Sequence, residues 1–169
     1  RAHCLSHEGR HLLAAAAYEE VQRLFSEGNF APTALLSGAE AYGRAGDLTS
    51  AERLYRRVLS VYNASPEALS ARLQLAHVLF AGGDVDGARD QLAALATHAP
   101  EADETRDGLL LAGRISLFAG ELEAASRSFD QLRASHGSSA HTDSGAIELP
   151  QYLLQVGSYA KAAATFAEA

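Results

Sequence analysis

Three columns of residues recur along this chain at an interval of 37. A glycine stands at each step, an alanine follows it by five positions, and a large apolar residue follows the alanine by four. The members are Gly9, Gly46, Gly83, Gly120 and Gly157, then Ala14, Ala51, Ala88, Ala125 and Ala162, then Tyr18, Tyr55, Leu92, Phe129 and Phe166. Columns that stay in step over five units identify a repeat protein.

The repeated unit has the sequence features of two helices joined by a tight turn. Gly46 ends an apolar-periodic run, where a helix commonly closes in a left-handed conformation. Asp47 then offers a cap to a second helix, and Asp84 and Glu121 occupy the same column. The second run places one apolar face at helical spacing, made of Leu48, Ala51, Leu54, Tyr55 and Val58. Neither helix can bury its face alone, so the hairpins are expected to stack.

These signals predict an all-α fold, a right-handed α-solenoid of stacked antiparallel helical hairpins. We expect a single array over residues 1–169 with about five repeats, and we expect the chain to be a segment of a longer one. The predicted repeats are 1–28 (partial), 29–63, 64–100, 101–137 and 138–169 (partial). The second helix is expected over residues 10–27, and Ser65 is expected to cap the first helix of the third repeat. Residues 137–145 are expected to form a polar loop, and the first helix of the fifth repeat is expected either to be kinked at Pro150 or to start near Pro150 and be short.

The pattern Ala39, Tyr42, Gly46-Asp47, Ala51 and Tyr55, with Pro66 near the end of the unit, resembles the tetratricopeptide repeat family. The period of 37 exceeds the family's 34, so the additional residues are expected between one hairpin and the next. The family's usual tryptophan position falls on Leu35, Arg72 and Leu109. Sel1-like repeats are an alternative, although their glycine-containing insertion is not evident.

Composition restricts the classes of partner. The formal net charge is −7, and the positive charges form no stripe, which disfavours nucleic acid and anionic lipid as ligands. Cys4 is the only cysteine, which fits a reducing compartment. No apolar run reaches the roughly 20 residues of a membrane span. We therefore expect an intracellular, cytoplasmic protein with no membrane insertion.

One cluster resembles a set of metal ligands. His3 and His7 are four apart on a predicted helix, with Cys4 between them and His11 beyond Gly9. Neither a carboxylate nor a second cysteine completes the set, so the sequence predicts no metal and no cofactor. The segment Asp84-Val-Asp86-Gly87 lacks most ligands of a calcium loop. Because a nucleophile elbow and a phosphate loop are also missing, we expect no enzymatic activity.

The resemblance implies that the first helices of the hairpins line a concave groove that takes a peptide or a helix. Carrying the groove columns over gives the candidate binding residues Glu40, Arg44, His77, Phe80, Arg114 and Gln151. His3 and His7 belong to the same columns. Repeats that clamp the carboxylate tails of chaperones use lysines and asparagines at these columns. Chaperone-tail binding is therefore disfavoured here.

These observations favour a non-catalytic scaffold or adaptor that binds a protein partner within a multi-subunit intracellular assembly. An alternative is a ligand-responsive regulatory domain of a multidomain protein, such as a transcription regulator. An accessory segment of an enzyme is a third possibility.

Overall fold

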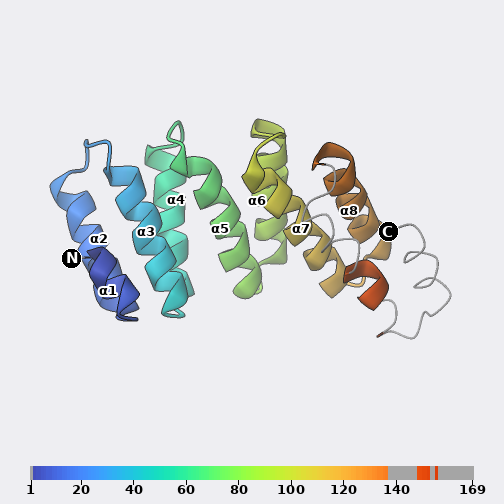
Figure 1. Ribbon diagram of the computed structural model, residues 1–169, viewed down its shortest axis with the longest axis horizontal. Helices are drawn as coiled ribbons and strands as arrows, with labels where there is room; N and C mark the ends of the chain where they lie inside the picture. Colours follow the sequence, from blue (N-terminus) through green and yellow to red (C-terminus); the bar gives the residue numbers. More distant parts are fainter. Residues whose placement is uncertain (1, 137–147, 153–154, 156–169) are drawn as a thin grey trace. The chain divides into compact units, whose positions relative to one another are not determined.

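The computed structural model describes residues 2–136, 148–152 and 155, and within them it contains helices and no strand. Figure 1 labels the helices in chain order, and residues 148–152 are helical as well. The labelled helices are α1 (Ala2–His7), α2 (His11–Leu24), α3 (Ala31–Arg44), α4 (Leu48–Val61), α5 (Glu67–Ala81), α6 (Val85–His98), α7 (Asp103–Phe118) and α8 (Leu122–His136).

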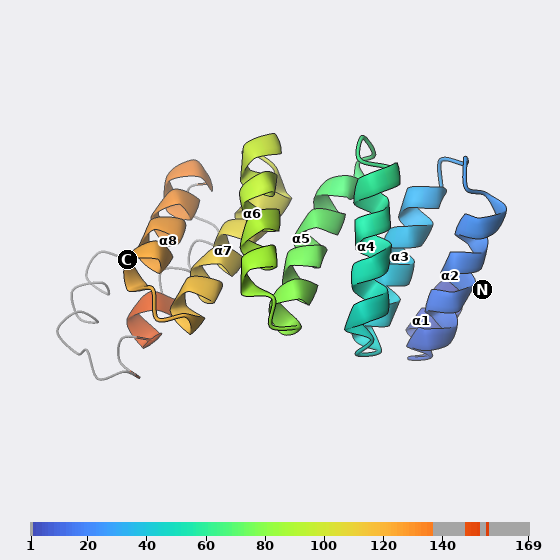
Figure 2. The same ribbon diagram turned by 180° about the vertical axis from the view of Figure 1, so that it is seen from behind.

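The chain divides into two compact units, residues 1–91 and 92–169. In the first unit, α1 packs on α2, α2 on α3, α3 on α4, and α5 on both α4 and α3. The two opposite views in Figures 1 and 2 show α1 and α3 in one layer of this unit and α2 and α4 in the other. The turns from α1 to α2 and from α3 to α4 lie at the same edge. The predicted all-α solenoid of helical hairpins is confirmed.

The second unit is built around the hairpin of α7 and α8. Its core is larger in side-chain volume than the alanine-rich contact in the first unit between α1–α2 and α3. The buried members are Leu110, Leu117, Ala125, Phe129, Leu132 and Leu149, with Leu109, Leu122 and Tyr152 packed around them. Leu149 and Tyr152 extend this core into the helical residues 148–152.

The repeated glycines close the first helix of each hairpin in a left-handed conformation. Their φ angles are +74° at Gly9, +80° at Gly46, +89° at Gly83 and +75° at Gly120. No other residue type has a positive φ in the described parts of the chain. A side chain at these positions would be strained because its Cβ would crowd the following carbonyl. The predicted role of Gly46 is confirmed, while Gly157 lies outside the described residues.

The small and large columns form the contacts between helices. The alanines at positions 14, 51, 88 and 125 are fully buried. In the column of large residues, Tyr55, Leu92 and Phe129 are buried and Tyr18 is half-buried. Asp47 caps α4 by accepting a hydrogen bond of 3.0 Å from the backbone N–H of Ser50. Asp84 caps α6 in the same way, at 2.9 Å from the N–H of Gly87.

Two helix ends differ from those expected. The second helix was expected over residues 10–27, but α2 ends at Leu24. Gly28 donates to the carbonyl of Phe25 and accepts from Ala31, so these backbone groups make turns in place of helical bonds. Ser65 was expected to cap the next helix, but the N-cap of α5 is Pro66 and no side chain caps it.

The region around Pro150 is only partly described. Pro150 lies in the helical residues 148–152, and its ring is fully buried next to Leu149. A proline ring fills apolar space well where the missing N–H is not required. The loop predicted at 137–145 and most of the fifth predicted repeat lie outside the described residues.

One end of the first unit leaves apolar side chains uncovered. The described part of α1 is six residues long, whereas α3 has 14 residues and α5 has 15. Figure 1 shows α1 beside only the lower half of α2. Val21 on α2 is 36% exposed, whereas Val58, 37 positions later, is 0% exposed. Leu13 and Leu24 of α2 are exposed as well, and so is Phe25 directly after this helix.

Candidate functional site

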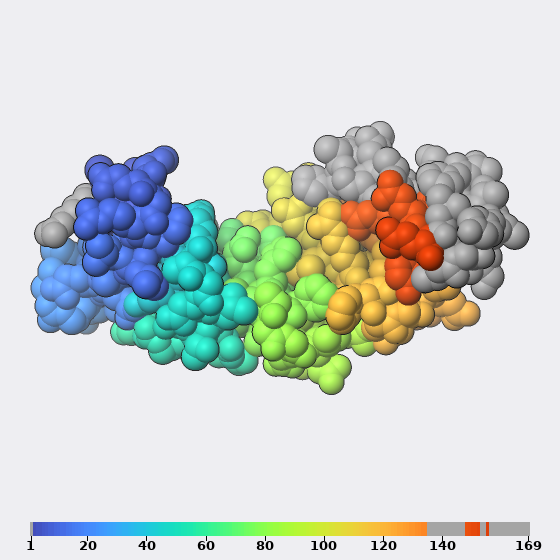
Figure 3. Space-filling view, turned by 90° about the horizontal axis from the view of Figure 1, so that it is seen from below, coloured from blue at the N-terminus to red at the C-terminus, as the bar shows by residue number. Residues whose placement is uncertain are grey.

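A hollow of about 460 Å³ opens in the first unit between α1, α2 and α3. Seen from the edge that carries the glycine turns, α1 (dark blue in Figure 3) stands out as a block beside the α3–α4 hairpin. The residues that line the hollow are His3, Ser6, His7, His11, Tyr18, Ser37, Glu40 and Arg44. Two of the predicted groove residues, Glu40 and Arg44, are therefore brought together with the two histidines of the same columns.

Glu40 and Arg44 present both signs of charge to this hollow. They are four residues apart on α3 and form an ion pair with an N–O distance of 3.4 Å. Both side chains are more than a third exposed, 37% for Glu40 and 54% for Arg44. An exposed pair of this length contributes little to stability. The carboxylate and the guanidinium can therefore exchange their mutual contact for contacts with a bound peptide.

The remaining groove candidates divide between the two units. His77 is exposed and Phe80 is half-buried on α5, in the first unit. Arg114 on α7 and Gln151 in the helical residues 148–152 are both exposed and belong to the second unit. The structure thus shows a local hollow around Glu40 and Arg44, and the extension of the site over the other four residues stays a prediction.

Arg114 already holds a carboxylate. Its Nε donates to Oε2 of Glu148 at 2.9 Å, and its Nη2 donates to Oε1 at 2.5 Å. This side-chain hydrogen bond raises the pKa of Arg114 above its ordinary value. Planar, two-point pairing of this kind is the strong form of a guanidinium–carboxylate contact. A partner carboxylate at Arg114 would have to displace Glu148, which makes Arg114 a weaker candidate than the sequence suggested.

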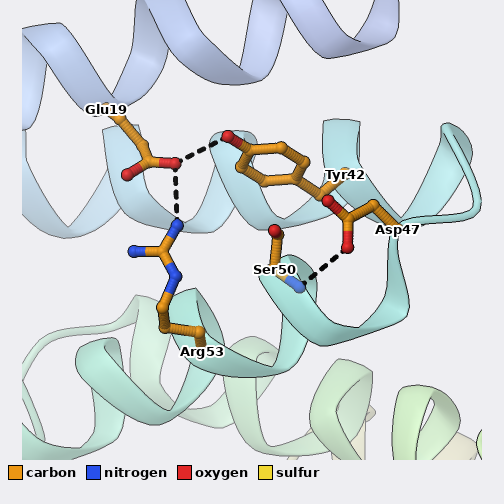
Figure 4. A network of polar contacts seen from close by, with 5 residues as sticks. All are labelled: Glu19, Tyr42, Asp47, Ser50 and Arg53. Carbon is orange, nitrogen blue, oxygen red and sulfur yellow. Dashed lines mark hydrogen bonds and ion pairs between the residues drawn. The ribbon is translucent and has the colours of Figure 1, made fainter.

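A second hollow, of about 590 Å³, lies against α2, and three charged side chains of its lining, Glu19, Glu20 and Arg23, already have partners. At its edge, one oxygen of Glu19 accepts from the hydroxyl of Tyr42 at 2.8 Å and from Arg53 at 3.0 Å (Figure 4). Burial, and then the bond to Glu19, raise the pKa of Tyr42. Glu20 and Arg23 pair with each other at 2.7 Å. The contacts of Glu19 join α2 to α3 and α4, whereas the pair of Glu20 with Arg23 lies within α2, so we assign all of them to the structure of the first unit.

Sequence reasoning missed the Glu19–Tyr42–Arg53 network. The reason is that Tyr42 has an apolar counterpart in three of its four other repeat positions, where Leu5, Leu79 and Leu153 stand. Glu19 and Arg53 are 34 residues apart, and so are Arg114 and Glu148. A systematic search for opposite charges at this offset would have found both pairs.

The described parts of the chain lack two features. None of the described helices has the length and apolar character needed to cross a membrane. Within the same residues, no three or more His, Cys, Asp or Glu side chains form a group that could hold a metal ion.

Comparison with known proteins finds a repeat family over part of the chain. Residues 44–106 match the family described as tetratricopeptide repeat. No curated protein matches the chain.

Solved structures share the fold at low sequence identity. A Podosopora anserina kinesin light chain protein with nearly identical TPR-like repeats has a TM-score of 0.76 at 17% identity, over 99% of this chain and 88% of its own. MamA from Desulfovibrio magneticus RS-1 has a TM-score of 0.74 at 17% identity, over 99% and 88%. A tetratricopeptide repeat protein from Parabacteroides merdae has 0.76 at 15% identity, over 99% and 63%. At these identities the likeness shows the fold alone.

Proposed function

We propose that this chain, a tetratricopeptide-repeat protein, acts as a non-catalytic scaffold or adaptor that binds a partner peptide or helix inside a multi-subunit intracellular assembly. Tetratricopeptide repeats are in general protein–protein interaction modules. Stacked helical hairpins present a hollowed face formed by their first helices, and such faces suit an extended or helical segment.

The observation that carries the proposal is the hollow beside α3. It offers a carboxylate at Glu40, a guanidinium at Arg44 and hydrogen-bonding groups at Ser37 and Ser6 within one concave surface. Because the ion pair of Glu40 with Arg44 is long and exposed, it can open without loss of a buried contact. A segment with a basic residue next to an acidic one fits this surface.

The test reverses the polarity of this pair without removing a charge. The double variant Glu40→Arg with Arg44→Glu keeps the net charge, the spacing and an ion pair on α3. Cross-linking followed by mass spectrometry on the full wild-type chain would identify the partner segment, and fluorescence anisotropy would then measure its Kd. We expect the double variant to weaken binding by about tenfold or more, because like charges now face each other across the interface.

A matched control lies in the other layer of the same unit. Glu52 and Arg56 on α4 also form an ion pair at a spacing of four, at 2.8 Å, and are similarly exposed. The variant Glu52→Arg with Arg56→Glu should leave the Kd unchanged. A wild-type Kd in both double variants would show that the binding site is not in the hollow. An equal loss of affinity in both would show a nonspecific effect of reversing an ion pair.

A further inference from the structure

Two histidines meet at the rim of the hollow. His3 and His7 are four residues apart on α1, and their Nε2 atoms lie 3.0 Å apart. The rings are edge to face, with centroids 4.5 Å apart and an interplanar angle of 84°. Both side chains are exposed, so an ion from solvent can reach the two nitrogens.

This separation matches two neighbouring ligands on one transition-metal ion. With metal–nitrogen bonds of about 2.0 Å, ligands at right angles lie about 2.8 Å apart, and tetrahedral ligands lie about 3.3 Å apart. The observed 3.0 Å falls between these values and closer to the right-angled arrangement. We propose that the Nε2 atoms of His3 and His7 bind one Cu(II) ion in adjacent positions, the ion replacing the hydrogen bond that joins the rings in its absence.

The choice of Cu(II) follows from the small number of protein ligands. No group of three or more suitable side chains occurs in the described residues, so the proposed site has two protein ligands and water in its other positions. A structural zinc site takes four protein ligands and is not satisfied by two. Cu(II) binds a given set of nitrogen ligands more tightly than the other divalent ions of its row, and it accepts a tetragonal arrangement with water.

The surroundings of the pair are polar and open. His11 and Glu40 line the same hollow, and the Nδ1 of His11 is buried without a hydrogen-bond partner. Arg44 supplies the one guanidinium of this lining, and it is paired with Glu40. The proposed site revises the sequence-based expectation of no metal. It is independent of the proposed function, because it needs no protein partner.

The experiment titrates Cu(II) into the full chain and follows binding by calorimetry and by electron paramagnetic resonance. An added N-terminal extension keeps a free α-amino group away from His3, since that group with His3 would create a copper site of its own. All variants carry Cys4→Ser to remove the thiol. We expect an ion with nitrogen ligands, and we expect His3→Ala and His7→Ala each to weaken its binding by at least about tenfold, as loss of a ligand should.

The deciding variant is His7→Ala, because a site made by the N-terminus and His3 would not respond to it. His77→Ala, at an exposed histidine on α5, is the control and should leave the affinity unchanged. Unchanged affinity in His7→Ala, an equal loss in His77→Ala, or no bound copper would each overturn the proposal. Circular dichroism of each variant checks that the helices are retained, and His3→Gln and His7→Gln repeat the test with polar side chains.

Discussion

At the scale of single residues, one repeat has a glycine where other repeats have an alanine, and a large side chain packs beside it. Gly113 on α7 stands in the column that Ala39 and Ala76 occupy in other repeats. A Cβ at Gly113 would lie 2.3 Å from Cε1 of Phe129, whose ring is buried in the second unit. The bulk of Phe129 thus takes the space that alanine uses elsewhere in the column.

This contact predicts that Gly113→Ala destabilises the protein although alanine favours helix. The methyl group must push a buried ring, and overpacking of this kind costs about 1–3 kcal/mol. Gly43 in α3 is the matched control, because a Cβ there meets nothing within 4 Å. Gly43→Ala should therefore stabilise by about 0.4–1 kcal/mol. Urea unfolding measures both free energies, and a stabilised Gly113→Ala would show that Phe129 moves aside freely.

At the scale of the helix, the N-cap of α4 depends on both the hydrogen bond and the negative charge of Asp47. The carboxylate of Asp47 accepts from the N–H of Ser50 (Figure 4). Hydrogen bonds to Ser50 lower the pKa of Asp47 below its ordinary value. The carboxylate is thus favoured in the folded chain, so its stabilising contribution is present above the ordinary pKa of aspartate. That contribution is lost as the pH falls through the lowered value in the folded state.

The pH dependence can be isolated with Asp47→Asn. Asparagine caps a helix about as well as aspartate but does not titrate. We expect the variant's Tm to be close to that of the wild type at pH 7 and to fall less than the wild-type Tm on acidification to about pH 2. Because Asp47 is only half-buried, added salt should leave the capping hydrogen bond in place and reduce the stabilisation that comes from its charge. A Tm difference that stays constant with pH would contradict this assignment.

At the scale of the whole molecule, apolar packing is divided into separate clusters. The cluster of Ala14, Ala15 and Ala41 belongs to the first unit, and the cluster that contains Phe129 and Leu132 belongs to the second. In a chain of stacked repeats, each hairpin is stabilised mainly by itself and its neighbours. Local damage should therefore have local effects.

The corresponding variant is Leu132→Ala, at a side chain with 0% exposure in the second unit. Its loss should cost about 2–5 kcal/mol. Hydrogen exchange should accelerate at the amides of α7 and α8 and change less at those of α2 to α4. Leu12→Ala, at an exposed leucine, is the control and should change neither. Equal acceleration in α2 to α4 would show that the protein unfolds as one cooperative body.

Local chemistry explains why most helix ends could be predicted. Gly46 closes α3 because it lacks a Cβ, and Asp47 opens α4 because its carboxylate reaches Ser50. Both effects act within four residues, so they can be predicted from the sequence. The errors arose where several backbone groups competed, as at Phe25 and Gly28, where turn hydrogen bonds ended α2 early.

The candidate site was only partly predictable. Periodicity placed Glu40 and Arg44 on the first-helix face, and the structure brings them into one hollow with His3 and His7. The repeat columns, compared at an interval of 37, did not indicate that Glu148 would engage Arg114, because these two residues are 34 positions apart.

The amino-acid sequence by itself determined the all-helical hairpins, their period and the buried alanine column, because backbone strain, capping and helical periodicity act over a few neighbouring residues. Only the tertiary structure decided which side chains meet between helices. The Glu19–Tyr42–Arg53 network, the ion pair of Arg114 with Glu148 and the hollow beside α3 depend on where separately formed helices come to rest. Packing over the whole unit sets the positions of these helices, and no local sequence pattern specifies them.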